Sequence, residues 1–227
     1  MSFVLIHGAG SDGWYWHRVL PLLRDNGHEA IAPDLPVGDD SAGLADYAEA
    51  VLDAAAGRTG VVVVAQSLGG FTAPLVAEAL EASLLVMLNA MTPWPGESPG
   101  EWWASTGWDG EIPDTDEAIE RVFLHDLPPE VAALSAGHAV PQSGTPFEKP
   151  WPLQEWPDVP TRFLGGRDDR FFPIGFQRRV ARERLGVDLD EIDGGHLVAL
   201  SRPEELAERL GSYAAAPESA PRPSFVR

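Results

Sequence analysis

The 227-residue sequence contains no cysteine and few basic residues, and both absences narrow what the protein can be. Without cysteine, disulfide bonds and thiolate metal sites are excluded. Only 16 Lys and Arg side chains accompany 35 Asp and Glu, which gives a formal net charge of −19. A field of that sign repels nucleic acid phosphates and anionic lipid, so we expect neither as a partner.

Long apolar runs are also missing, and we expect no targeting segment at residues 1–6. No stretch approaches the roughly 20 apolar residues that a bilayer requires, and residues 1–6 lack the basic region that opens a secretory signal peptide. We therefore expect a cytoplasmic protein without a membrane span. Hydrophobic residues at 44% and charged residues at 22% are typical of a folded globule. The length favours one domain and leaves the oligomeric state open, a homodimer included.

Short apolar runs alternate with amphipathic helical patterns along most of the chain. Strands are predicted at residues 3–6, 29–32, 61–65, 84–88, 161–164 and 187–192. Helices are predicted at residues 16–25, 44–52, 68–80, 174–184 and 203–213. The run 61–64 is apolar without alternation, which is typical of a parallel strand covered on both faces. We therefore predict an α/β fold with a mostly parallel central sheet of about six strands and helices on both faces.

Residues 91–157 interrupt this alternation. Proline and glycine are dense there, and the segment holds most of the tryptophans, namely Trp94, Trp102, Trp103, Trp108, Trp151 and Trp156. Weak helical patterns at 115–124 and 129–134 predict a small inserted cap over the carboxyl ends of the strands, where open α/β sheets bind ligands. A packed excursion without a pocket is the alternative. The predicted domain is residues 1–213, with its core at 1–90 and 158–213, and residues 214–227 are expected to form a flexible tail.

A candidate nucleophile follows the third predicted strand, in Ala65-Gln66-Ser67-Leu68-Gly69-Gly70. Small residues stand two before and two after Ser67, and a helical pattern follows at once. A sharp strand-to-helix turn strains the serine backbone and leaves room only for small neighbours, which is the form of a nucleophile elbow. The pattern alone is weak evidence, since a serine that caps a helix fits it equally well.

A base and a carboxylate that would activate this serine occur later in the chain. His196 follows the last predicted strand behind two glycines, so a loop can carry its ring to the edge of the sheet. Asp168 and Asp169 follow the 161–164 strand, and a buried carboxylate there would fix the imidazole. We choose Asp169 from its place in the loop and expect Asp168 to pair with a nearby arginine or with backbone. The other location for such an acid, after the 84–88 strand, holds Asn89.

The loop after the first strand, His7-Gly8-Ala9-Gly10, supplies the remaining element. The chain order serine, aspartate, histidine, with a loop of this type near the start, is that of α/β-hydrolases. The oxyanion of a tetrahedral intermediate needs about two preorganised N–H donors. We expect the backbone N–H groups of Ala9 and Leu68 to be this pair, and His7 to brace the loop.

The same glycines also satisfy a dinucleotide-binding pattern. Gly8 to Gly13 reads G-x-G-x-x-G after a strand, and Asp34 stands near the end of the next strand. However, a pyrophosphate needs a helix that begins inside the glycines, and the rings of residues 14–16 would crowd its approach. A nicotinamide enzyme also gives no reason for the positions of Ser67 and His196. An NAD-dependent oxidoreductase is therefore disfavoured, and we expect no metal and no organic cofactor.

Four motifs in order carry a family resemblance. I-H-G-A-G-S-D-G-W-Y-W, A-Q-S-L-G-G, D-D-R-F-F-P and G-G-H-L-V-A-L-S-R-P resemble the plant methylesterase and hydroxynitrile lyase group of α/β-hydrolases and its bacterial esterase relatives. The resemblance covers residues 1 to about 90 and 158–213 and leaves out the cap. It implies an α/β-hydrolase fold with Ser67 as nucleophile, Asp169 as acid, His196 as base, and the amides of Ala9 and Leu68 as oxyanion donors.

Two positions bear on the reaction within that group. Cyanohydrin cleavage is associated with Thr at the position of Gly8 and with Lys at the position of Leu197. The apolar Leu197 therefore favours ester hydrolysis through an acyl-enzyme. A C–C lyase and a receptor that binds a small molecule without turnover remain alternatives. The chain departs from the group at Ala65 and Gln66, where Gly and His are common, so hydrogen bonding beside the site is expected to differ.

The substrate is expected to be a neutral carboxylic ester of small to medium size, because the acidic chain would not attract anionic groups. Tryptophans of the cap suggest a pocket with aromatic walls, although their alternative role is the cap's own core. The residues expected to line this pocket are Gly8, Trp102, Trp103, Phe123 and Leu197.

Overall fold

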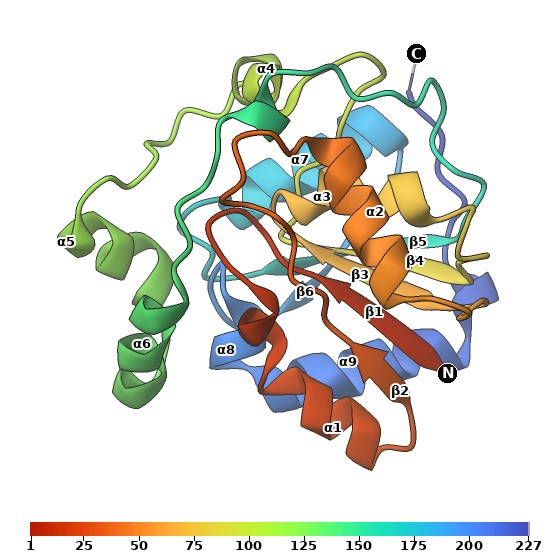
Figure 1. The fold of residues 1–227 in the computed structure, drawn as a ribbon, viewed down its shortest axis with the longest axis horizontal. Coiled ribbons are helices and arrows are strands. Elements are labelled where there is room, and N and C mark those ends of the chain that lie inside the picture. Colours follow the sequence, from red (N-terminus) through yellow and green to blue (C-terminus); the bar gives the residue numbers. More distant parts are fainter. Residues whose placement is uncertain (227) are drawn as a thin grey trace.

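A six-stranded sheet forms the centre of the computed structural model, which describes residues 1–226 (Figure 1). The strands are β1 (Ser2–Ile6), β2 (Glu29–Ile31), β3 (Val62–Gln66), β4 (Leu84–Leu88), β5 (Thr161–Gly166) and β6 (Leu189–Ile192). They are arranged in the order β2-β1-β3-β4-β5-β6, and every neighbouring pair is parallel. The predicted α/β class and number of strands are confirmed, and the carboxyl ends of all strands meet at one edge.

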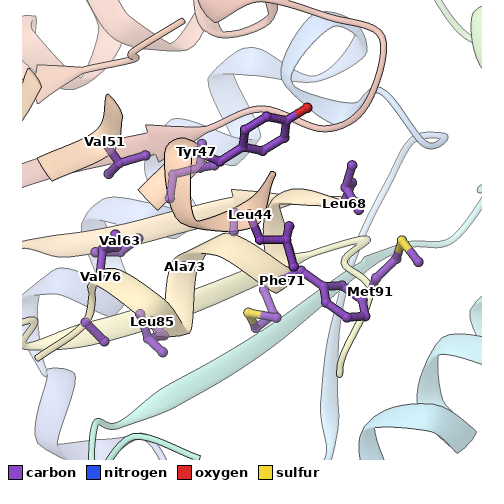
Figure 2. Close-up of a cluster of buried hydrophobic side chains, with 14 of the residues drawn as sticks. Leu44, Tyr47, Val51, Val63, Leu68, Phe71, Ala73, Val76, Leu85 and Met91 are labelled. Atoms are coloured by element: carbon purple, nitrogen blue, oxygen red, sulfur yellow. The ribbon is translucent and has the colours of Figure 1, made fainter. Parts of the chain in front are cut away.

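Helices cover both faces of the sheet. One face is covered by α2 (Leu44–Ala54), α3 (Gly69–Val76) and α7 (Ile174–Leu185), and the other by α1 (Val19–Asp25), α8 (Val198–Ser201) and α9 (Pro203–Ala215). Figure 2 shows Val51 of α2 and Val76 of α3 packed over Val63 on the first face. The neighbours of Val63 along β3 point to the other face, because side chains alternate along a strand. None of the helices in residues 1–226 is long and apolar enough to cross a membrane.

The first predicted helix, at residues 16–25, begins later than expected. The chain forms a short 3-10 helix, η1 (Gly13–Trp16), which Asp12 caps by accepting the N–H of Trp14, and α1 starts only at Val19. The predicted helix at 68–80 likewise ends at Val76 and continues as a turn. Both differences lie at helix ends, where capping rather than hydrophobic spacing sets the boundary.

The segment between β4 and β5 contains α4 (Pro99–Ser105), α5 (Asp116–Ile119), a π-helical turn η2 (Glu120–Leu124), α6 (Pro129–Ser135) and two short 3-10 helices, η3 (Ala136–His138) and η4 (Thr145–Phe147). Figure 1 shows α5 and α6 to one side of the sheet, joined to the rest by extended stretches. Helix α4 was not predicted. Its signal is a capping box, in which Ser98 and Glu101 bond each other's backbone N–H groups.

The predicted flexible tail follows α9, and its described part packs against the core. The N–H of Thr161 donates to the carbonyl of Pro221 at 2.8 Å, and the N–H of Val226 donates to the carbonyl of Arg184 at 2.9 Å. The ring of Phe225 lies 6.1 Å from that of Trp151. Ala220 and Pro223 are buried in this segment, and Phe225 is half-buried. Arg227, the last residue of the predicted tail, lies outside the described residues.

Candidate active site

Ser67 lies in the turn between β3 and α3 in a strained backbone conformation. Its φ is 52°, in the left-handed region that costs a non-glycine residue about 1–2 kcal/mol. Its carbonyl accepts the N–H groups of Gly70 at 3.0 Å and Met91 at 2.9 Å, which hold the turn. A Cβ on Gly70 would lie 2.0 Å from the Met91 carbonyl oxygen, and one on Gly69 would lie 2.9 Å from the His7 carbonyl oxygen. The strand, tight turn and helix expected of an elbow are therefore present.

His196 and Asp169 form a buried pair. The imidazole Nδ1 lies 2.8 Å from Asp169 Oδ2, and the two residues are 3% and 4% exposed. Asp169 Oδ1 accepts the N–H groups of Phe171 and Phe172, both at 2.8 Å, so the carboxylate is fixed from its other side. Because Nδ1 donates to this carboxylate, Nε2 is left as the basic nitrogen. Asp168, the rejected candidate, is exposed.

Asn89 links the loops that carry these two residues, and sequence reasoning did not give it a role. Its Nδ2 donates to the carbonyls of Gly195 and His196, each at 3.1 Å, and its Oδ1 accepts the N–H of Gly166 at 2.7 Å. Gln66, which directly precedes the serine, also donates to the His196 carbonyl, at 3.3 Å. The histidine backbone is thus tied to the ends of β3 and β4. A polar residue directly after a wholly apolar strand is the signal that could have identified Asn89.

The loop after β1 passes directly beside Ser67. A Cβ on Gly8 would lie 2.8 Å from Ser67 Cβ and 2.4 Å from Gln66 Oε1, so only glycine fits. His7 braces this loop, because its Nδ1 donates to the Gly8 carbonyl at 2.8 Å and its Nε2 accepts the N–H of Leu35 at 3.1 Å. Burial lowers the pKa of His7 below its usual 6.5, which keeps the ring neutral.

The two amides expected as oxyanion donors flank the serine. Leu68 directly follows Ser67, and Ala9 directly follows the glycine that contacts it. Within residues 1–226, neither of these N–H groups donates to a protein acceptor. An oxyanion hole requires donors of this kind, whose hydrogen bonds are not already made to the protein.

The cap contacts the loop after β1. Gly10 is held from both sides, because its N–H donates to Gln142 Oε1 at 3.1 Å and its carbonyl accepts the N–H of Val140 at 3.0 Å. His138 Nδ1 lies 3.0 Å from Asp12 Oδ2. The returning part of the cap thus sets the position of the loop that carries the Ala9 amide.

The glycine pattern that suggested a dinucleotide site serves a different purpose. The N–H of Gly13 donates to Asp34 Oδ1 at 2.8 Å, so the acid of the pattern holds the loop itself. The first long helix begins only at Val19, well beyond the glycines. No three His, Asp or Glu side chains within residues 1–226 converge as a metal site would require.

The five residues expected to line a pocket fall into two groups. Gly8 contacts Ser67, Leu197 follows the histidine, and the ring of Phe123 lies 5.4 Å from that of His196. Trp102, in contrast, is 1% exposed and belongs to the main core, where its Nε1 donates to the Thr92 carbonyl. Trp103 packs at the edge of that core, with its ring 4.7 Å from Trp108.

Aromatic rings lie against the imidazole of His196. The rings of Phe171 and Phe172 each lie 5.2 Å from that of His196, and Phe171 lies 4.8 Å from Phe123. Phe171 also borders a surface hollow of about 430 Å³ in the cap, whose lining includes Trp108, Ile112, Val122, Arg121 and Arg170. The motif D-D-R-F-F-P contains both phenylalanines, but its pattern does not show that their rings border His196.

Comparison with known proteins identifies the family. The model described as "Alpha/beta hydrolase family" matches residues 3–209. The chain is 36% identical to the probable esterase PIR7A of Oryza sativa subsp. japonica, over 94% of this chain and 96% of that protein. It is 28% identical to the pyrethroid hydrolase of Sphingobium wenxiniae, over 95% and 88% of the two chains. The crystal structure of a pyrethroid hydrolase from Sphingobium faniae JZ-2 matches with a TM-score of 0.79 and 25% identity, over 96% of this chain and 99% of that one.

These matches confirm the resemblance predicted from four short motifs. They also extend across the cap, which the motifs did not cover. The chain belongs to the alpha/beta hydrolase family.

Proposed function

We propose that this protein hydrolyses neutral carboxylic esters, with Ser67 as nucleophile, His196 as general base and Asp169 as the carboxylate that orients the imidazole. The observation that carries the proposal is the buried hydrogen bond of 2.8 Å between Asp169 and His196, in loops tied to the strained turn of Ser67. The family relatives support the reaction class, since those named above are esterases or hydrolases of pyrethroids.

The reaction begins with attack of Ser67 Oγ on the ester carbonyl carbon while His196 Nε2 accepts the hydroxyl proton. The carbonyl oxygen becomes an oxyanion, which the N–H groups of Ala9 and Leu68 stabilise. Collapse breaks the bond to the alcohol, which leaves with the proton held on His196, and an acyl-serine remains. Water then attacks this acyl-enzyme while His196 accepts a proton from it; collapse breaks the bond to Ser67 Oγ, which takes the proton back, and the carboxylic acid is released. Asp169 stabilises the imidazolium in both halves.

The substrate is a neutral ester with an apolar or aromatic group next to its carbonyl. Support comes from the rings of Phe123, Phe171 and Phe172 around the imidazole and from the net charge of −19. An anionic acyl group would approach against that charge. Hydrolysis rates across an ester panel of varied size and charge test this, and a preference for multiply charged esters contradicts it.

The proposal is tested by treating the protein with a fluorophosphonate and mapping the adduct by mass spectrometry. We expect one adduct per chain, on Ser67, and none in Ser67→Ala. The same substitution should lower kcat on an activated ester about a thousandfold or more without changing the thermal unfolding profile. Retention of most of the activity by Ser67→Ala contradicts the assignment. Aldehyde release without an acyl-enzyme would indicate a C–C lyase, and tight ligand binding with slow turnover would indicate a receptor.

A further inference from the structure

The cap places a carboxylate directly on the loop that carries His196. Asp126 follows the π-helical turn, and its Oδ2 accepts the backbone N–H of Gly195 at 2.6 Å. A Cβ on Gly195 would lie 2.7 Å from Asp126 Oδ1 and 3.0 Å from His125 Nε2. The glycine before the catalytic histidine is therefore what allows the cap carboxylate to approach the amide.

We propose that Asp126 is a positioning residue for the ester hydrolysis proposed above. Its carboxylate accepts the Gly195 N–H and so fixes the backbone beside His196. This keeps the imidazole where it can accept the proton of Ser67. The cap thereby contributes to the catalytic machinery as well as covering it.

The loop that carries His196 is held by hydrogen bonds from two parts of the protein, the sheet and the cap. From the sheet, Asn89 donates to the carbonyls of Gly195 and His196, each at 3.1 Å. From the cap, Asp126 takes the N–H of Gly195. Hydrogen bonds to an ionised acceptor are stronger than those between neutral groups. The bond from the Gly195 N–H to Asp126 is therefore expected to hold the loop more strongly than either bond from Asn89. If the cap lifts, this N–H loses its partner and the histidine backbone is held from one side only.

The charge of Asp126 acts on the same interior as that of Asp169. Burial raises the pKa of the Tyr15 phenol, and the nearby charges of Asp169 and Asp126 raise it further. Other ionisable groups around the loop are His125 of the cap and Arg202, whose Cγ would lie 3.2 Å from a Cβ on Gly194. Removing the charge of Asp126 therefore changes the electrostatic field at the loop that carries His196.

Three variants separate the hydrogen bond from the charge. Asp126→Ala removes both, whereas Asp126→Asn keeps an oxygen that can accept from Gly195 and removes only the charge. The matched control is Asp109→Asn, which makes the same change at an exposed cap residue. For each variant, kcat and KM on a p-nitrophenyl ester are measured from about pH 5 to pH 9, across the range in which histidine titrates. Amide hydrogen exchange of residues 193–198 and thermal unfolding are measured in parallel.

We expect Asp126→Ala to lower kcat about tenfold or more, with little change in KM and faster exchange in residues 193–198. Asp126→Asn should retain more of kcat, and its rise of kcat/KM with pH should move to lower pH by at least about a few tenths of a unit. Asp109→Asn should match the wild type in every measurement. The pH shift is the readout that a purely structural role for Asp126 would not produce.

The inference is overturned by one combination of results: the wild type is labelled on Ser67, and both Asp126 variants have the same kcat and pH profile as the wild type. If Asp126→Ala does not fold, Asp126→Asn decides by its kcat and by the amide exchange of residues 193–198, because a neutral acceptor binds the Gly195 N–H less strongly than a carboxylate does. A wild type that neither hydrolyses esters nor reacts with the fluorophosphonate contradicts the proposed function instead. In that case amide hydrogen exchange tests the contact on its own. If residues 193–198 exchange in both Asp126 variants as slowly as in the wild type, Asp126 does not hold the loop.

Discussion

Replacing Asn89 should destabilise the fold and disable the site together, because this side chain joins the ends of three neighbouring strands. Asn89→Gly leaves the Gly166 N–H without an acceptor and removes a donor from the carbonyls of Gly195 and His196. A buried polar group without a partner costs about 1–3 kcal/mol. The Gly166 N–H and the Gly195 carbonyl each lose the one partner named above, whereas Gln66 still donates to the His196 carbonyl. We therefore expect a loss of about 3 kcal/mol in the free energy of unfolding.

Asn89→Ala should cost about 1 kcal/mol more than Asn89→Gly. The φ of Asn89 is 44°, in the left-handed region that asparagine tolerates and glycine adopts without strain, whereas alanine pays for it. For a chain of this length, 1 kcal/mol corresponds to a shift of about 2–4 °C in Tm. The expected decreases are thus about 6–12 °C for glycine, with a further few degrees for alanine.

Urea denaturation followed by tryptophan fluorescence measures these losses, and the rate of fluorophosphonate labelling at Ser67 reports on the site. Asn26→Gly is the matched control, since Asn26 is exposed at the end of α1 with a φ of −82°. A loss of less than about 1 kcal/mol in both Asn89 variants, or an alanine variant as stable as the glycine variant, contradicts the role given to this side chain.

Three further predictions rest on other buried contacts. Arg184→Met leaves the buried carboxylate of Glu97 without the guanidinium whose Nη2 lies 2.9 Å from Oε1. Urea denaturation should show a loss of about 3–5 kcal/mol in the free energy of unfolding, and a loss below about 1 kcal/mol contradicts this. Burial lowers the pKa of His7 from 6.5 in the folded protein, so the unfolded chain takes up the proton at higher pH than the folded one. The stability that the neutral ring provides is therefore complete above about pH 6.5 and declines below it. His7→Phe should therefore reduce stability at about pH 8, where the Leu35 N–H loses its acceptor, and should flatten the decline between about pH 7 and pH 5; an unchanged slope contradicts the assignment. Gly8→Ala should slow labelling of Ser67 about tenfold or more, because its Cβ would fall 2.8 Å from the serine Cβ, and an unchanged rate means that the loop adapts.

Much of this architecture is readable from local patterns. The apolar runs located the strands to within a few residues, because both faces of a parallel sheet are buried. Ser67 and Asp169 could be chosen from small neighbours and loop position, since the chemistry restricts which residues fit at those turns. Exposed Asp168 beside buried Asp169 agrees with that choice.

The sequence did not reveal contacts between residues that meet only in three dimensions. Asp126 and Gly195 are 69 residues apart, and nothing local distinguishes Asp126 from the other acids of the cap. Trp102 was expected near the substrate, yet it is a core residue, because a tryptophan satisfies either role equally well in a pattern. Composition alone likewise does not show that Phe225 of the tail lies beside the ring of Trp151.

The cap leaves the sheet after β4 and returns in β5, and these strands are neighbours whose register pairs Leu85 with Thr161. The pairing of β4 with β5 therefore fixes the distance between the two ends of the cap, whatever the length of the cap. Doubling the length of such a closed loop costs only about 0.6 kcal/mol of conformational entropy. The stretch that holds α5 and α6 can accordingly be lengthened, shortened or exchanged at small thermodynamic penalty, provided that a replacement still carries an acceptor for the Gly195 amide. Grafting caps between scaffolds of this kind is thus a practical way to diversify what they accept.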